Sequence, residues 1–182
     1  MIKKIFRALL YRIRGEYTTE KLQKMGLKIG KNFNRLHEVI LDPAHCWLIE
    51  IGDNVTLAPR VHILAHDAST VYYLGYAKIG RVTIGNRVFI GASTVVLPNV
   101  RIGDDVIVGA NSTVTGDLES GYVYAGSPAK KLCSTEEFIQ KNKSLIKESP
   151  CYGEEYTIRA DIDTNKKVQM IKELENSVGF VK

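Results

Sequence analysis

Histidine and aspartate side chains stand together in the segment Ile63-Leu-Ala-His-Asp-Ala-Ser-Thr70. An imidazole has an unperturbed pKa of about 6.5, which suits His66 to take a proton from a hydroxyl or amine near neutral pH. The adjacent Asp67 is a candidate for orienting that imidazole, with Asp42 or another acid as the alternative. His62 is the competing base or a substrate contact. The segment therefore predicts a proton-transfer site, and the alternative is a structural loop histidine.

The elements that must position this site follow a six-residue rhythm. An aliphatic residue returns at every sixth position, and a small or apolar residue follows four positions later. The aliphatic set is Ile84, Ile90, Val96, Ile102, Val108 and Val114, and the second set is Val88, Thr94, Val100, Val106 and Ser112. A chain that turns a corner every six residues produces this period, whereas a helix or a simple strand does not. The pattern predicts a three-sided solenoid, with a β-sandwich as the alternative.

The rhythm is interrupted upstream of this stretch. It also runs through Ile51, Leu57 and Ile63, but the step from Ile51 to Ile84 is not a multiple of the six-residue period. We therefore predict that a segment between about residues 64 and 82 leaves the coil as an extruded loop and carries His66 with it. Tyr72 and Tyr73 in this loop suit a sugar or nucleotide substrate, and they suit contact with a second subunit equally well.

Length and composition limit the remaining possibilities. The chain has 182 residues, a formal net charge of +5 and a pI near 9.0, which fits one domain with a sizeable core. Its three cysteines are widely spaced, so we expect reduced thiols and a cytoplasmic protein rather than a disulfide framework or a zinc cluster. The chain has no basic-aromatic stripe, and we therefore expect no nucleic-acid partner.

We expect three segments along the chain: residues 1–26 as an N-terminal helical segment, 27–132 as the solenoid, and 133–182 as a helical C-terminal tail able to cap the solenoid. Residues 1–14 have the pattern of a basic amphipathic helix that is too short to span a membrane. This helix packs on the protein itself, or it docks peripherally on an anionic membrane.

Helix signals also occur on both sides of the solenoid. Residues 18–25 predict a short helix before Gly26. In the tail, Ser134-Thr-Glu-Glu137 matches the capping-box spacing, and Val168, Ile171 and Leu174 indicate a second helix.

Residues 84–103, together with Ala125-Gly-Ser-Pro-Ala-Lys130, resemble the hexapeptide-repeat acyltransferases. The similarity is closest to the maltose, galactoside and nodulation-factor acetyltransferases and to sugar acetyltransferases of surface-polysaccharide pathways. The resemblance covers about residues 27 to 132. It implies an all-β solenoid, a left-handed parallel β-helix with an extruded loop, short N-terminal helices and a helical C-terminal tail. It also implies a homotrimer with active sites between neighbouring subunits.

The resemblance further implies acetyl-CoA as the acyl donor and His66 as the catalytic base. Small residues one coil apart match the positions that contact coenzyme A, and a backbone N–H there can bond the developing oxyanion. The donor-side residues carried over are Ala92, Ala110, Thr115 and Lys130, with Lys131 beside them as a phosphate partner. Asn34 and Asp42 keep the relative spacing of acceptor-binding residues in the galactoside branch, and a role as corner-forming polar residues is equally open.

The expected function is acetylation of a sugar or nucleotide-sugar, on oxygen or nitrogen, for surface polysaccharide or glycoconjugate synthesis. The alternatives are acetylation of serine or a xenobiotic, and a non-catalytic scaffold. We expect no metal requirement. The γ-carbonic anhydrases of the same fold bind zinc through three histidines, whereas here only His62 and His66 cluster.

Overall fold

The structure is a computed structural model that describes residues 17–182, so the predicted helix over residues 1–14 lies outside the described part. The chain forms two compact units with the boundary after Thr135, and each is described by itself. The three-segment division at residues 26 and 132 stays a prediction.

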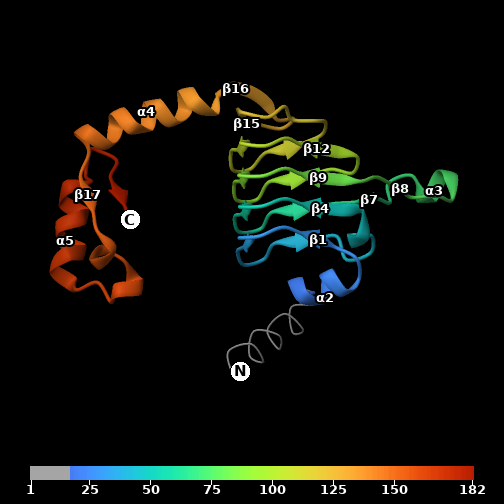
Figure 1. Ribbon diagram of the computed structural model, residues 1–182, viewed down its shortest axis with the longest axis horizontal. Coiled ribbons are helices and arrows are strands. Elements are labelled where there is room, and N and C mark those ends of the chain that lie inside the picture. The colour runs from blue at the N-terminus through green and yellow to red at the C-terminus, as the bar shows by residue number, and fades with distance from the viewer. Residues whose placement is uncertain (1–16) are drawn as a thin grey trace. The chain divides into compact units, whose positions relative to one another are not determined.

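The first unit is a three-sided parallel β-helix, as Figure 1 shows. Sheet A contains β1 (Lys28–Ile29), β4 (Ile49–Ile51), β9 (Val82–Ile84) and β12 (Val100–Ile102). Sheet B contains β2 (Asn34–Arg35), β5 (Thr56–Leu57), β10 (Phe89–Ile90), β13 (Ile107–Val108), β15 (Tyr122–Ala125) and β16 (Lys130–Ser134). Sheet C contains β3 (Ile40–Leu41), β6 (His62–Ile63), β11 (Val95–Val96) and β14 (Thr113–Val114). The antiparallel β15–β16 pair ends sheet B.

The predicted rhythm is confirmed in the interior of this prism. Every aliphatic residue of the six-residue series is buried, and strand partners in neighbouring coils are three repeats apart, as in the pairing of Phe89 with Ile107. The two polar members of the second series are also buried. The hydroxyls of Thr94 and Ser112 both donate to the Gly109 carbonyl, at 3.1 and 2.7 Å, so their burial leaves no unpaired donor.

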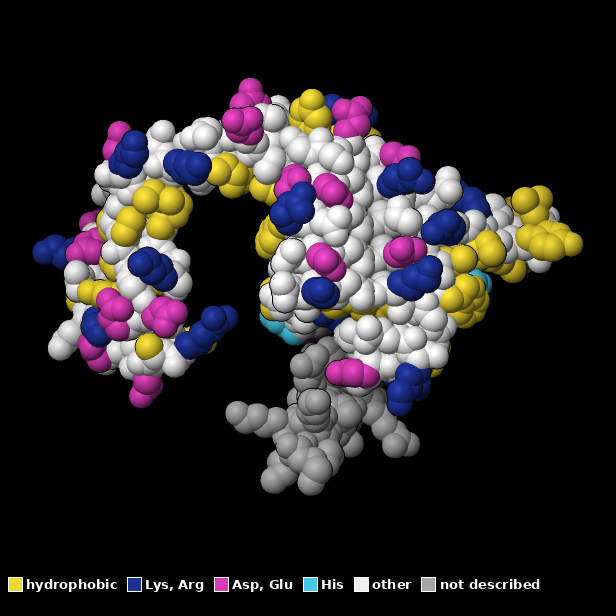
Figure 2. Space-filling view, viewed as in Figure 1, with side chains coloured by type: hydrophobic (Ala, Val, Ile, Leu, Met, Phe, Trp, Pro, Cys, Tyr) yellow, Lys and Arg dark blue, Asp and Glu magenta, His cyan; other side chains and the backbone are white. Residues whose placement is uncertain are grey.

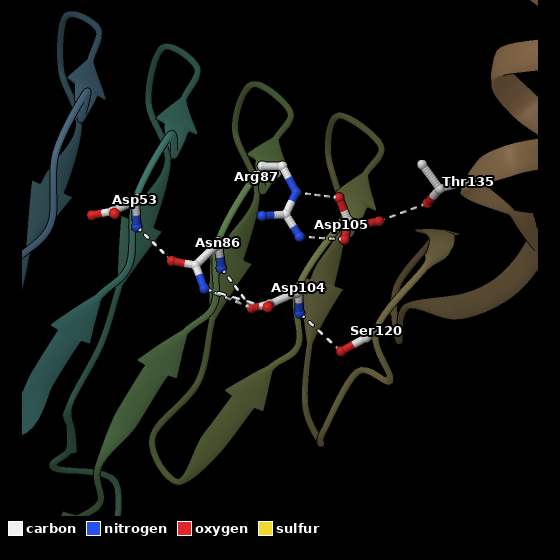
Figure 3. A network of polar contacts seen from close by, with 7 residues as sticks. All are labelled: Asp53, Asn86, Arg87, Asp104, Asp105, Ser120 and Thr135. Carbon is white, nitrogen blue, oxygen red and sulfur yellow. Dashed lines mark hydrogen bonds and ion pairs between the residues drawn. The ribbon is translucent and has the colours of Figure 1, made fainter.

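The corners of the prism are stacked as regularly as its faces. Corner residues after sheets A and B adopt the left-handed conformation with φ between 54° and 61°: Asn32, Asn54, Arg87 and Asp105 in one stack, and Glu38, Arg60, Ser93 and Asn111 in the other. Figure 3 shows how the first corner is held. Asn86 Oδ1 accepts from the Asp53 amide at 2.9 Å, and Asp104 Oδ1 accepts from the Asn86 amide at 2.7 Å. This ladder fixes the coil-to-coil register.

Two coils are longer than the repeat, and both extra segments leave at the same corner, between sheets C and A. Lys28 pairs with Glu50 rather than with Cys46, which lies one regular coil further along, because the segment 42–48 adds a 3-10 turn, η1 (Cys46–Leu48). Thr56 pairs with Phe89 rather than with Leu74, because residues 64–81 leave the prism. This second segment contains β7 (His66–Asp67), α3 (Val71–Leu74) and β8 (Lys78–Ile79). The predicted extruded loop is therefore confirmed.

Helices α2 and α4 follow the sequence signals. The predicted short helix is α2 (Thr19–Lys24), whose first turn is capped by Thr18, with Leu22 buried. The capping-box signal marks the start of α4 (Thr135–Glu148).

The rest of the second unit contains one further helix and one strand pair. Its elements are β17 (Cys151–Tyr152), η2 (Glu154–Tyr156), η3 (Ile158–Ala160), α5 (Thr164–Glu173) and β18 (Phe180–Val181). The expected second tail helix is α5, and Asp163 caps it by accepting from the Lys166 amide at 2.9 Å. Capping of the solenoid by this tail stays a prediction. In the part of the chain that the structure describes, no helix is long and apolar enough to cross a membrane.

Candidate active site

The two inserted segments bring an aspartate and a histidine together across neighbouring coils. Asp42 directly follows β3, and its amide donates to the Ile63 carbonyl at 2.9 Å, so it stands next to the start of the extruded loop. His66 lies three residues beyond Ile63, and its Nδ1 is 2.5 Å from Asp42 Oδ2. The Asp42 side chain is fully buried, whereas 35% of the His66 side chain is exposed. The pair therefore combines a buried carboxylate with an imidazole that solvent and substrate can reach.

The Asp42 carboxylate is held as an anion by three donors. Oδ2 also accepts from the Ala65 amide at 2.9 Å, and Oδ1 accepts from the Ala44 amide at 3.0 Å. Burial by itself raises the pKa of Asp42, but the hydrogen bonds from His66, Ala65 and Ala44 outweigh it and the net pKa is lowered. An ionised carboxylate at Nδ1 favours the tautomer with its proton on Nδ1 and leaves Nε2 with a free lone pair. The pair is thus arranged for proton uptake at Nε2.

Two further rings extend this arrangement along the insertion at residues 42–48. The ring centroid of His45 is 5.3 Å from that of His66, with 45° between the planes. The Trp47 ring lies 5.3 Å from His45 on centroids, at 54°. Three rings therefore follow one another from the imidazole of His66 to an indole that is 53% exposed.

The same cluster offers candidate metal ligands. Donor atoms of Asp42, His45 and His66 all lie within 4.8 Å of one another. In a tetrahedral zinc site with bonds of about 2.0–2.2 Å, two ligand atoms are separated by about 3.4 Å. The Asp42 and His66 atoms are 2.5 Å apart, so as they stand they share a proton rather than a cation.

We expected Asp67 to orient His66, but in the structure its carboxylate is engaged elsewhere. Its Oδ1 accepts from the Ser69 amide at 2.9 Å, and this backbone bond is the main cause that lowers the pKa of Asp67. Both residues belong to β7, and neighbouring side chains of a strand point to opposite faces. The position beside His66 Nδ1 is occupied by Asp42, the alternative acid.

The donor-side alanines stack as the eighteen-residue spacing predicts. Ala92 and Ala110 stand at the corner between sheets B and C in successive coils, and the Asn111 amide donates to the Ala92 carbonyl at 2.8 Å. The edge is narrow because a Cβ added at Gly91 would lie 2.5 Å from the Ala110 nitrogen. Thr115 is exposed just beyond β14.

The two candidate phosphate lysines have different surroundings. Lys131 Nζ is 2.5 Å from Glu119 Oε2 and 3.7 Å from the centroid of the Tyr122 ring. The hydrogen bond to Glu119 is the main cause that raises the pKa of Lys131. Lys130 is exposed at the start of β16, and none of the ion pairs found among residues 17–182 includes it. Lys130 is therefore the more available of the two cations.

The predicted acceptor-side residues are not all brought together within one chain. His62 lies half-buried on the outer face of sheet C, between Ile40 and Val95 in the strand register. Asn34 is exposed on sheet B, a different face from the corner that holds Asp42 and His66.

The tyrosines of the extruded loop also stand apart from the histidine. Tyr72 and Tyr73 are 93% and 82% exposed on α3, which lies beyond β8 and away from the coils (Figure 1). Figure 2 shows hydrophobic side chains gathered over this loop.

Comparisons with known proteins identify the repeat and the fold. The family model described as "Bacterial transferase hexapeptide (six repeats)" matches residues 81–116. Protein CapG from Staphylococcus aureus is 35% identical over 145 residues, which are 77% of this chain and 83% of CapG.

Solved structures show the same fold. A maltose O-acetyltransferase from Clostridium difficile 630 superposes with a TM-score of 0.54 at 34% identity, over 60% of this chain and 59% of that one. A galactoside acetyltransferase in complex with coenzyme A has a TM-score of 0.55 over 74% of this chain and 80% of that one, and at 24% identity this likeness concerns the fold alone. The three-sided parallel helix, the repeat and the relationship to CapG establish that this chain belongs to the hexapeptide-repeat acetyltransferases, whose fold is the left-handed β-helix.

Proposed function

We propose that this protein transfers an acetyl group from acetyl-CoA to a hydroxyl or amine of a sugar or nucleotide-sugar in surface polysaccharide or glycoconjugate synthesis. The observation that carries the proposal is the buried Asp42 carboxylate on Nδ1 of the accessible His66, which leaves Nε2 open as a base. The relationship to a maltose O-acetyltransferase supports both a sugar acceptor and the transfer of an acetyl group.

The reaction follows from the groups present. Nε2 of His66 takes the proton as the acceptor oxygen or nitrogen attacks the thioester carbonyl carbon. The carbonyl electrons move onto oxygen, and a backbone N–H near Ala92 stabilises that oxyanion. When the carbonyl re-forms, the carbon–sulfur bond breaks and the imidazolium returns its proton to the thiolate. Asp42 stabilises the imidazolium between these two proton transfers.

We propose that the pantetheine arm of acetyl-CoA lies along the stacked edge of Ala92 and Ala110 and passes Thr115. Lys130, rather than Lys131, then contacts a phosphate of the coenzyme. His62, Tyr72 and Tyr73 remain proposed acceptor contacts.

A homotrimer is part of the proposal. Within one chain the alanine edge lies between sheets B and C, whereas His66 lies between sheets C and A, so sheet C separates the two. A neighbouring copy that supplies its alanine edge, and its Asn34, to the His66 side of the first copy completes the site. We keep a cytoplasmic location, and peripheral membrane contact through residues 1–14, as predictions.

Mixed oligomers test the shared site. His66→Ala and Ala110→Trp chains are each expected to be inactive alone, because one lacks the base and the other blocks the donor edge. Mixing and reassembling them is expected to restore up to about a quarter of the sites, since one interface can combine two intact halves. A mixture that stays inactive although mass spectrometry shows mixed trimers would contradict the shared site.

The experiment that tests the function measures thiol release from acetyl-CoA with a panel of hydroxy-sugars, amino-sugars, nucleotide-sugars, serine and chloramphenicol. Turnover with sugars or nucleotide-sugars supports the proposal. Turnover only with serine or chloramphenicol would replace the acceptor class, and absence of coenzyme A binding would favour a scaffold. Unchanged turnover after treatment with a chelator is expected for a metal-independent dyad.

A further inference from the structure

The insertion at residues 42–48 does more than supply Asp42. It also places the rings of His45 and Trp47 in series with the imidazole of His66. We propose that these three rings form the acceptor subsite, in which a sugar ring stacks on Trp47 while one of its hydroxyl or amino groups reaches Nε2 of His66. This inference rests on the proposed function and specifies where and how the acceptor binds.

The position of Trp47 supports this role. A single ring, His45, lies between Trp47 and His66, and both centroid separations are 5.3 Å. The indole is therefore two ring-to-ring steps from the imidazole, and we place the sugar so that it stacks on the indole and directs a hydroxyl toward the imidazole. The acceptor must approach Nε2 in any case, because Nδ1 is occupied by Asp42.

The exposure of Trp47 supports the same role. Large aromatic side chains are normally buried, yet 53% of Trp47 is exposed while its neighbour Cys46 is fully buried. An exposed indole offers an apolar face and an N–H donor, which match the C–H face and the hydroxyls of a sugar.

The Trp47 side chain is also held in place before any ligand binds. On one side, Gly26 at φ 110° packs so closely that an added Cβ would lie 2.8 Å from Trp47 Cβ. On the other side stands His45, whose Nδ1 is buried without a hydrogen-bond partner in the described chain. A proton on Nδ1 would bury an unpaired donor, so the neutral ring carries its proton on Nε2. His45 therefore fills the space between the Trp47 indole and the His66 imidazole before a ligand arrives, and such preorganisation lowers the entropy cost of binding.

The chain offers a direct probe of this subsite, because Trp47 is its single tryptophan. Intrinsic tryptophan fluorescence of the wild-type protein is titrated, without acetyl-CoA, with methyl pyranosides and with the sugar that the turnover panel selects. A saturable change is expected for the sugar that is acetylated and no change for sugars that are not. Unaltered fluorescence at concentrations that saturate turnover overturns the proposal, and this measurement needs no variant.

Variants separate stacking from other roles. Trp47→Ala is expected to raise KM for the acceptor about tenfold or more, because the apolar face that packs against the sugar is lost, while KM for acetyl-CoA is unchanged. Trp47→Phe restores most of the loss. Phe138→Ala is the matched control, because Phe138 is an aromatic residue that is 37% exposed and belongs to α4 of the second unit.

Three results would overturn the inference. The first is a Trp47→Ala variant with a raised KM for acetyl-CoA instead, which would place the indole on the donor side. The second is a variant in which the oligomer dissociates while KM for the acceptor is unchanged, which would make Trp47 a subunit contact. The third is a variant in which both KM values are unchanged, which would remove Trp47 from the site. Absence of turnover with every acceptor would instead refute the proposed function, and the fluorescence titration with methyl pyranosides distinguishes the two failures.

Discussion

Replacing Asp42 by asparagine is expected to disarm His66 without emptying the space around it. The carboxylate accepts from His66 Nδ1, Ala65 and Ala44 through two oxygens, and an amide has only one oxygen to offer. Whichever way the amide turns, its NH₂ group faces at least one of these donors. The substitution therefore removes the charge at Nδ1, weakens the preference for the Nδ1–H tautomer and leaves at least one donor unpaired.

The magnitude follows from the bond that is lost. A hydrogen bond to a charged group contributes about 1.5–3 kcal/mol. A factor of ten in rate corresponds to about 1.36 kcal/mol, so kcat is expected to fall about 10- to 150-fold. KM for acetyl-CoA is expected to change little, because the Asp42 side chain is fully buried and its hydrogen bonds go to His66, Ala65 and Ala44.

The assay is steady-state thiol release with the selected acceptor, carried out on five proteins: wild type, Asp42→Asn, His66→Ala, the double variant and Asp67→Asn. Because Asp42 acts through His66, Asp42→Asn is expected to have no further effect in a His66→Ala background. Asp67→Asn is the control, since the Asp67 carboxylate bonds the Ser69 amide. The reasoning would be refuted if Asp67→Asn lost much of its kcat while Asp42→Asn kept full activity. It would also be refuted if the two losses in kcat were additive in the double variant.

Three further predictions concern the donor edge and stability. Gly91→Ala places a Cβ 2.5 Å from the Ala110 nitrogen and is expected to lower the free energy of unfolding by about 1–3 kcal/mol. Gly116→Ala is the control and is expected to be neutral, because an added Cβ there has nothing within 4 Å. Equal melting temperatures of the two variants would contradict the tight packing at the alanine edge. Lys130→Ala is expected to raise KM for acetyl-CoA about 2- to 5-fold and Lys131→Ala less, because Glu119 already engages Lys131; the reverse order in initial-rate measurements would exchange their roles. Asp42 has a lowered pKa in the folded protein, so its carboxylate stabilises the fold above the ordinary value of 3.8, and this contribution is lost as the pH falls through the lower folded value. The melting-temperature gap between wild type and Asp42→Asn is therefore expected to shrink as the pH is lowered below 3.8, and a gap that widens on acidification would contradict this sign.

The sequence carried most of the fold because backbone geometry imposes it repeatedly. The inward positions from Ile84 to Val114 recur every six residues, and each is buried in the structure. The extruded loop was predictable for the same reason, since the step from Ile51 to Ile84 cannot fit the repeat. His66 could be assigned to that loop because the rhythm stops there.

The partners of His66 could not be obtained in this way. Asp42 is 24 residues from His66 in sequence, and the four extra residues of the first coil decide which side chain faces it. The irregular early coils concealed this register, so Asp67, which is adjacent to His66, was favoured over the alternative Asp42. His45 fell on a loose upstream continuation of the six-residue rhythm, and Trp47 lay off that rhythm, so the sequence pattern placed neither ring beside His66.

Single-chain geometry also explains why some expected residues remain apart. Asn34 and Asp42 were paired by their spacing, but sheet B carries the first and the corner after sheet C carries the second. Lys130 and Lys131 were equivalent in the sequence, and only the side chains of Glu119 and Tyr122 distinguish them.

The central claim is that His66 acts as the general base of an acetyl transfer. The most direct measurement compares kcat for thiol release from acetyl-CoA, at saturating acceptor, between wild type and His66→Ala at equal melting temperature. A general base contributes about 10²–10⁴-fold, and a loss of that size is predicted for His66→Ala. Undiminished turnover in the folded variant would contradict the account.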